Sequence, residues 1–290
     1  MTPEWIAVDI EAPVDAGELL SRLEDPHVTG AWEQDQGVRL YWPADRWNGD
    51  VLARLRALLS VADGIVPPVR VQTVPAQDWN TEWAKSVTPI RIGRRILVRP
   101  SWTVVEKAEG DIELVLDPKQ AFGTGHHATT QLLVEWLEDK IQGHERVLDV
   151  GTGSGLLAMV ALRLGAVSAI GIDHDPVAIE CARGYARQNG FGAECALHVG
   201  DLDWLGEQDL LTVDLILANL DRRTLLESAK PLSGWLNRGA RLLMSGLLAA
   251  DQGEIAAAYA DVGAAVREVR ERDGWLAMEV LKVDSCEGTD

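Results

Sequence analysis

The octapeptide LDVGTGSG, residues 148–155, decides the fold class. The apolar run RVLDV leads into its first glycine, and the apolar stretch LLAMVALRL follows its last one. This order predicts a strand, a tight turn and a helix, which together hold nucleotide-like ligands at the carboxyl edge of a parallel sheet. Gly151, Gly153 and Gly155 let the backbone turn sharply and let a ligand approach the main chain closely.

The spacing of these glycines selects the class of ligand. The dinucleotide fingerprint G-x-G-x-x-G needs a glycine at position 156, where this chain has Leu156, and the Lys-Ser or Lys-Thr of a P-loop is missing. Asp173 ends the next predicted strand, where a carboxylate accepts hydrogen bonds from ribose hydroxyls. The pattern therefore favours an adenosyl ligand without a pyrophosphate, such as S-adenosylmethionine, over a turn that serves packing alone.

Strand-like and helix-like segments alternate from about residue 104 onward, which predicts an α/β domain with a parallel sheet covered on both faces. Asp175 and Pro176 are expected to open one helix, Gly165 to end another, and Pro231 to interrupt a third. The predicted strands are 146–153 (a strand with its turn), 167–173, 193–200, 213–220, 239–248 and 275–282, and the predicted helices are 155–165, 175–190, 222–236 and 251–263.

Residues 4–75 follow a different order, β-α-β-β-α-β, which is that of a ferredoxin-like α+β domain. Asp15 is a plausible N-cap of the first helix, with Glu18 three residues later. The unit contains no reactive cluster, so we interpret residues 1–75 as a substrate-recognition domain; the alternative is that they only stabilise their neighbour. The predicted organisation is completed by a linker, residues 76–103, and a catalytic domain, residues 104–290.

The linker contains a short predicted helix, a hairpin and a local basic run, Arg91, Arg94, Arg95 and Arg99. Such a run in an acidic chain favours a solvated strand face with internal ion pairs over a nucleic-acid patch.

The composition of the chain indicates which kinds of binding partner and which cellular compartment to expect. The 290 residues carry a formal charge of −18, which argues against a nucleic-acid groove or an anionic membrane surface. Three cysteines without paired spacing indicate a reducing compartment. The N-terminus has no basic start or apolar region of a signal peptide, and no apolar run reaches the roughly 18 residues of a membrane span. We expect a cytoplasmic protein that binds neither nucleic acid nor membrane and acts as a monomer.

Further candidate residues surround the glycine turn. Asn219 ends the predicted strand LILANL, where a carboxamide can accept a hydrogen bond from a substrate amine or simply satisfy a turn. Asp201 ends the preceding strand and either meets an adenine amino group or caps a turn. A second glycine cluster, LDPKQAFGTGHHATT, spans residues 116–130. Its adjacent histidines, His126 and His127, rarely point at one centre, so no metal site is expected.

Five stretches together resemble the PrmA family, bacterial enzymes that methylate ribosomal protein L11 of the large subunit. They are DWNTEWAKSVTPIRIGRRILVRPSW, LDPKQAFGTGHHATTQLLVEWL, LDVGTGSGLLAMVALRLGA, AIGIDHDPVAIECARGYARQNG and LILANL. The resemblance covers nearly the whole chain and is most specific over residues 116–130. It implies a class I methyltransferase with a Rossmann-like, mostly parallel seven-stranded sheet, S-adenosylmethionine as cofactor, and an N-terminal domain that binds the ribosomal protein.

The resemblance also implies roles for particular residues. The substrate amines would be lysine ε-amino and N-terminal α-amino groups, and Asn219 would act as the catalytic residue by orienting the amine. Together with the glycine pattern, it assigns the cofactor to Thr130, Gly151, Gly153, Asp173 and Asn219, beneath a loop over the methyl group that includes Phe122, Gly123 and Thr124.

Some positions depart from the family's usual sequence. HHATT, residues 126–130, stands where the family usually has Thr-His-Pro-Thr-Thr, and LANLDRRTL lacks the usual continuation after Asn219. These departures bear on the identity of the methylated protein more than on the identity of the cofactor. A lysine methyltransferase of another protein, such as the electron-transfer flavoprotein β-subunit, remains an alternative. A nicotinamide dehydrogenase and a non-catalytic adaptor are less consistent with Leu156 and with the intact candidate site.

Overall fold

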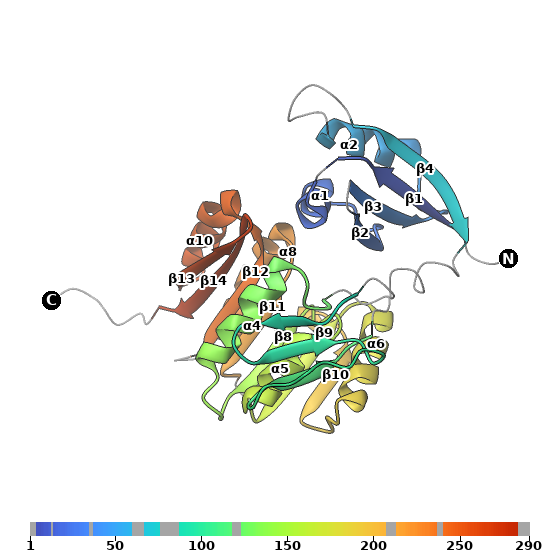
Figure 1. The fold of residues 1–290 in the computed structure, drawn as a ribbon. Coiled ribbons are helices and arrows are strands. Elements are labelled where there is room, and N and C mark those ends of the chain that lie inside the picture. Colours follow the sequence, from blue (N-terminus) through green and yellow to red (C-terminus); the bar gives the residue numbers. More distant parts are fainter. Residues whose placement is uncertain are drawn as a thin grey trace. The chain divides into compact units, whose positions relative to one another are not determined.

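The computed structural model describes residues 4–12, 14–34, 37–59, 67–75, 87–117, 123–206, 213–236 and 240–283. The chain divides into two compact units, Met1–Val87 and Thr88–Asp290 (Figure 1). Residues 88–103, which the sequence analysis placed in a linker, therefore belong to the second unit. The helix expected before the hairpin lies outside the described residues.

The first unit has the predicted ferredoxin-like order. Its sheet runs β2-β3-β1-β4 with antiparallel pairs throughout, and alternate residues of the central strands, such as Val8 and Leu40, pack with both helices in one core. The Asp15 side chain caps the first helix by accepting from the Glu18 amide at 2.7 Å, as predicted. The elements are β1 (Glu4–Ile10), α1 (Ala16–Leu23), β2 (Gly30–Gln34), β3 (Gly37–Pro43), α2 (Gly49–Leu59) and β4 (Val69–Pro75).

The second unit is built on a seven-stranded sheet in the order β10-β9-β8-β11-β12-β14-β13. The first five strands are parallel, and β14 runs antiparallel to both of its neighbours. This is the mostly parallel sheet expected of a class I methyltransferase. The strands are β8 (Arg146–Val150), β9 (Ser168–Asp173), β10 (Cys195–Val199), β11 (Leu215–Asn219), β12 (Arg241–Leu248), β13 (Ala264–Arg272) and β14 (Trp275–Lys282).

Helices cover this sheet on both faces, because successive strand residues point to opposite sides. Leu215 and Leu217 of β11 join a core with α4, α5 and α6, whereas Ile216 and Ala218 join a second core with α8, α9 and α10. No helix in the described part of the chain is long and apolar enough to cross a membrane. The helices are α4 (Ala128–Lys140), α5 (Leu156–Leu164), α6 (Pro176–Gln188), α7 (Leu202–Gly206), α8 (Arg222–Glu227), α9 (Ala229–Trp235), η1 (Ala249–Asp251) and α10 (Gln252–Asp261).

The predicted helix over 222–236 is divided into α8 and α9 at Ser228. Pro231 lies three residues later and has no N–H to donate to the carbonyl of Glu227, so the regular bonding pattern stops there. The interruption predicted from Pro231 is therefore present, but the break lies at Ser228, three residues before the proline. Strand β13 and helix α7 were not predicted. The segment REVRER of β13 carries charge on an edge strand, which weakens its apolar signal.

In the second unit, a three-stranded sheet with the order β5-β6-β7 precedes helix α4 in the sequence. Its first two strands form the predicted hairpin, and β7 pairs with β6 in parallel. Arg91 forms two 2.6 Å bonds with Asp111, and Arg99 pairs with Glu113, so internal ion pairs do occupy this basic run, as predicted. The strands are β5 (Ile90–Ile92), β6 (Ile96–Arg99) and β7 (Ile112–Val115).

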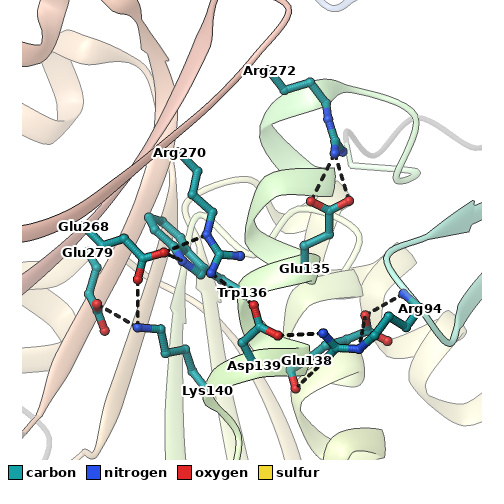
Figure 2. A network of polar contacts seen from close by, with 10 residues as sticks. All are labelled: Arg94, Glu135, Trp136, Glu138, Asp139, Lys140, Glu268, Arg270, Arg272 and Glu279. Carbon is teal, nitrogen blue, oxygen red and sulfur yellow. Dashed lines mark hydrogen bonds and ion pairs between the residues drawn. The ribbon is translucent and has the colours of Figure 1, made fainter.

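Polar contacts hold the C-terminal half of α4 on two sides (Figure 2). Lys140 bonds the carboxylates of Glu268 at 3.1 Å and Glu279 at 2.8 Å, on β13 and β14. Arg94, from the turn between β5 and β6, bonds Asp139 at 2.8 Å. The network thus fixes the helix whose first turn carries Thr130. Its members are Arg94, Glu135, Trp136, Glu138, Asp139, Lys140, Glu268, Arg270, Arg272 and Glu279.

Candidate functional site

Strand register places three of the predicted site residues in one row. Val150 of β8 pairs with Ile172 of β9 on one side and with Ala218 of β11 on the other. The residues that follow, Gly151, Asp173 and Asn219, therefore lie next to one another at the carboxyl edge of the sheet. Since neighbouring strands are about 4.8 Å apart, Asp173 and Asn219 flank the glycine turn at a separation of roughly 10 Å.

The backbone conformation of the turn after β8 favours glycine at three positions. Gly151, Gly153 and Gly155 have φ values of 68°, 53° and 77°, a region that residues with a side chain rarely adopt. A Cβ atom on Gly151 would come within 2.4 Å of the Leu220 side chain. Gly155 is the N-cap of α5, so the helix begins directly behind the turn. Because these glycines have no side chains, the main chain of the turn is accessible where the sequence predicted the ligand.

Asp173 bonds the glycine turn directly. Its Oδ2 accepts from the Gly153 amide at 2.9 Å, and its Oδ1 accepts from the Asp175 amide at 3.0 Å. The side chain is 11% exposed, so the carboxylate is held by the backbone and still reaches the surface of the edge. Two carboxylate oxygens have about four acceptor positions, which leaves capacity for the hydroxyls of a ribose. The remaining acceptor positions of Asp173 thus fit the ribose of an adenosyl group.

Asn219 is tied to the first turn of α4. Its Nδ2 donates to the Thr130 hydroxyl at 3.2 Å, although the two residues are 89 positions apart in the chain. Thr130 is buried, at 2% exposure, and therefore gives the carboxamide a fixed partner. With the amide nitrogen engaged, its oxygen is the remaining acceptor. Asn219, held by Thr130, thus presents its side-chain oxygen as a hydrogen-bond acceptor beside the glycine turn.

The two glycine clusters of the sequence meet in the structure. The Ser154 hydroxyl donates to the Gly123 carbonyl at 2.7 Å. Gly123 and Gly125 have φ values of 96° and 91°, and Thr124 between them bonds the ring of His126 at 3.3 Å. Gly123 is therefore linked to the glycine turn after β8, and Thr124 follows it directly, whereas Phe122 lies outside the described residues. Ser154 was not predicted as a site residue, although its position between two glycines of the turn indicates that it lies close to the site.

The two histidines have separate structural partners. His127 is the N-cap of α4, its Nδ1 lies 2.8 Å from the Thr129 hydroxyl, and its ring stands edge-on to Trp275 at 4.8 Å. The Nε2 of His126 lies 3.0 Å from the Thr88 carbonyl. Within the described ranges, no group of three or more histidines, cysteines and carboxylates is arranged around a common metal position.

Asp201 has one of its two predicted roles in the structure. Its carboxylate accepts from the Trp204 amide at 2.9 Å and so caps the short helix α7. The ring of Trp204 stacks on His198 with centroids 5.2 Å apart. The cap alone accounts for an aspartate at this position.

Asp149 is a buried carboxyl below the glycine turn that the sequence analysis did not assign to the site. It is 1% exposed and accepts from the Thr152 hydroxyl at 2.6 Å and from the Ala158 amide at 3.2 Å. Burial raises its pKa to about 6, against an ordinary 3.8, and the charge of Asp173 acts in the same direction. Asp149 ties the turn to the first turns of α5.

This raised pKa predicts a measurable pH dependence of stability. Because the folded pKa of Asp149, about 6, lies above the unfolded value of 3.8, the stabilisation from proton binding is lost as the pH rises through that window. The variant Asp149→Asn stays neutral. Its free energy of unfolding should therefore improve relative to that of the wild type by roughly 2 kcal/mol between about pH 4 and pH 7. Urea unfolding across this range measures it; a pH-independent difference contradicts it.

The sequence matches a model of one protein family over residues 14–283, and that family is described as ribosomal protein L11 methyltransferase (PrmA). A ribosomal protein L11 methyltransferase of Symbiobacterium thermophilum is 38% identical, covering 97% of this chain and 82% of the relative. Another, from Azotobacter vinelandii, is 37% identical and covers 97% of both chains.

Comparison with solved structures gives the same class. The crystal structure of a ribosomal protein L11 methylase from Lactobacillus delbrueckii subsp. bulgaricus superposes with a TM-score of 0.64 at 29% sequence identity. The match covers 68% of this chain and 100% of that one.

Proposed function

This chain belongs to the PrmA family, the ribosomal protein L11 methyltransferases, and we propose that it transfers methyl groups from S-adenosylmethionine to amines of ribosomal protein L11. The acceptors would be lysine ε-amino and N-terminal α-amino groups. One observation carries the proposal: Asp173, Gly151 and the Asn219–Thr130 pair lie together at the carboxyl edge of the sheet. An edge of this kind binds an adenosyl ligand beside a hydrogen-bond acceptor for an amine.

Each residue of the row has a distinct task in this proposal. The Asp173 carboxylate accepts from the ribose hydroxyls, and the backbone of Gly151 and Gly153 lies against the ligand. Thr130 and Asn219 lie at the methionine end. The segment that begins with Gly123 and Thr124 would lie over the reactive methyl group. The bond between Ser154 and Gly123 supports this last assignment, because it joins that segment to the cofactor turn.

The proposed mechanism is mainly one of alignment. S-adenosylmethionine supplies a methyl group that is already activated as a sulfonium, so the protein has to place the amine in line with it. The amine must be neutral, and removing the proton from a lysine at pH 7 costs roughly 4 to 5 kcal/mol. A water-poor site lowers that cost because desolvation disfavours the ammonium form. The Asn219 oxygen then accepts an N–H of the neutral amine and turns its lone pair toward the methyl group.

Asp173→Ala should weaken the affinity for S-adenosylmethionine by several tens-fold, which corresponds to a net loss of about 2 kcal/mol, within the range for a hydrogen bond to a charged group. Asp175→Ala is the matched control. Its carboxylate caps α6 through the Val177 amide at 2.8 Å, so this variant should lose about 1 kcal/mol of stability and keep its affinity. Titration calorimetry measures both dissociation constants. Equal affinity in Asp173→Ala and the wild type would remove the ribose assignment.

Transfer of a labelled methyl group to purified ribosomal protein L11 tests the function itself. We expect label on ribosomal protein L11 and none on the electron-transfer flavoprotein β-subunit, which is the alternative substrate. Label on the flavoprotein subunit alone would reject the substrate and keep the chemistry. Cofactor binding without label on any protein would favour the adaptor hypothesis. We further propose that the first unit recognises the substrate, and that the protein acts as a monomer in the cytoplasm.

A further inference from the structure

The hydroxyl of Ser154 forms two hydrogen bonds at the centre of the site. It donates to the Gly123 carbonyl at 2.7 Å and accepts from the Leu156 amide at 3.3 Å. Ser154 is only 1% exposed, so water does not compete freely for either partner. Gly123 is 31 residues away in the sequence, so this contact joins two separate segments of the chain.

The segment that follows Gly123 is closely packed against the same region. A Cβ on Gly123 would lie 3.3 Å from the Ser154 oxygen, and one on Gly125 would lie 3.3 Å from Leu156 and 3.1 Å from Ile92. His126 holds the other end of the segment at the Thr88 carbonyl. The Ser154 bond is therefore a polar contact that sets residues 123–125 against the start of α5.

We infer that Ser154 is a positioning residue for methyl transfer: its hydroxyl sets residues 123–125 against the cofactor turn. This inference rests on the proposed function, in which that segment lies over the reactive methyl group. Ser154 acts through the Gly123 backbone and needs no contact with either substrate. Its loss should therefore misplace the segment while Asp173, Gly151 and Asn219 keep their places in the sheet.

A purely local role predicts something else. If the bond to Leu156 were the important one, Ser154 would stabilise the turn and the first turn of α5. Its loss would then lower affinity for S-adenosylmethionine as much as it lowers the rate. The positioning role predicts a lower rate at nearly unchanged affinity.

The experiment compares Ser154→Ala with Ser233→Ala. Ser233 is an equally buried serine, at 2% exposure, whose hydroxyl donates to the Val262 carbonyl at 2.9 Å away from the site. Both variants lose one buried hydroxyl-to-carbonyl bond. For Ser154→Ala we expect kcat to fall by about tenfold or more, because misplacement of about 1 Å is enough for such losses. The dissociation constant for S-adenosylmethionine should stay within about threefold. Ser233→Ala should keep both values.

Equal kcat in the two variants would overturn the inference, and so would parallel losses of affinity and rate in Ser154→Ala. Hydrogen exchange gives a second readout that needs no methyl acceptor. In Ser154→Ala the amides of residues 123–126 should exchange faster, while those of residues 157–161 in α5 should not change. The reverse pattern would show a helix-capping role instead. If the wild type fails to label ribosomal protein L11, the proposed function fails, and the exchange data still decide the role of Ser154.

Discussion

Asn219→Ala should lower kcat for methyl transfer by about two orders of magnitude, the loss typical of removing one preorganised polar group from an active site. The side chain reaches the site from the end of β11, with its amide nitrogen bound to the Thr130 hydroxyl at 3.2 Å. In the proposed function, that bond leaves the side-chain oxygen of Asn219 as the acceptor for the substrate amine. Alanine removes the acceptor, and the neutral amine then samples many orientations relative to the methyl group.

Variants of Thr130 provide the control, because they act on the orientation of Asn219 without removing it. Thr130→Ser keeps the hydroxyl and should retain nearly full activity. Thr130→Val keeps the shape but removes the partner of the amide nitrogen, so its kcat should lie between those of Asn219→Ala and the wild type. Single-turnover rates at saturating cofactor separate these effects from binding. An Asn219→Ala enzyme as fast as the wild type would eliminate the assigned role.

Removing residues 1–87 should abolish methylation of ribosomal protein L11 and leave binding of S-adenosylmethionine intact. The two described cores of the second unit contain no residue of the first unit, which has its own core around Val8, Leu40 and Leu55. Residues 88–290 also contain Asp173, Asn219 and the turn. The truncated chain should therefore fold and bind cofactor, but lack the surface that we propose binds the protein substrate.

The separate unit supplies the control for this deletion. Residues 1–87 expressed alone should compete with the full chain for ribosomal protein L11 and so inhibit its methylation. Calorimetry with the cofactor, together with the labelling assay, measures both parts of the prediction. A truncated enzyme that labels ribosomal protein L11 at the full rate would show that recognition lies elsewhere.

The sequence was most informative where a local rule determines the structure. Gly165 ends α5 in a left-handed conformation, and Asp175 caps α6 through the Val177 amide, as their residue types predict. The order of strands and helices was likewise sufficient for both architectures. Strand β13 was missed because charged residues alternate along it, and its place in the sheet depends on pairing with β14.

The residues of the candidate site could be proposed one by one from the sequence, but the contacts that join them could not. Asp173 and Asn219 could each be identified from a strand end, and Thr130 from the family resemblance. The bond from Asn219 to Thr130 and the bond from Ser154 to Gly123 join distant segments, so no local pattern encodes them. The raised pKa of Asp149 also depends on complete burial, which only the packed fold reveals.

A crystal structure of this protein with S-adenosylmethionine tests the central claim most directly. We predict that both ribose hydroxyls lie within hydrogen-bond distance of the Asp173 carboxylate, with the methyl group on the side of Asn219. A cofactor whose ribose faces away from Asp173, or crystals in which this edge of the sheet binds nothing at saturating cofactor, would contradict the account.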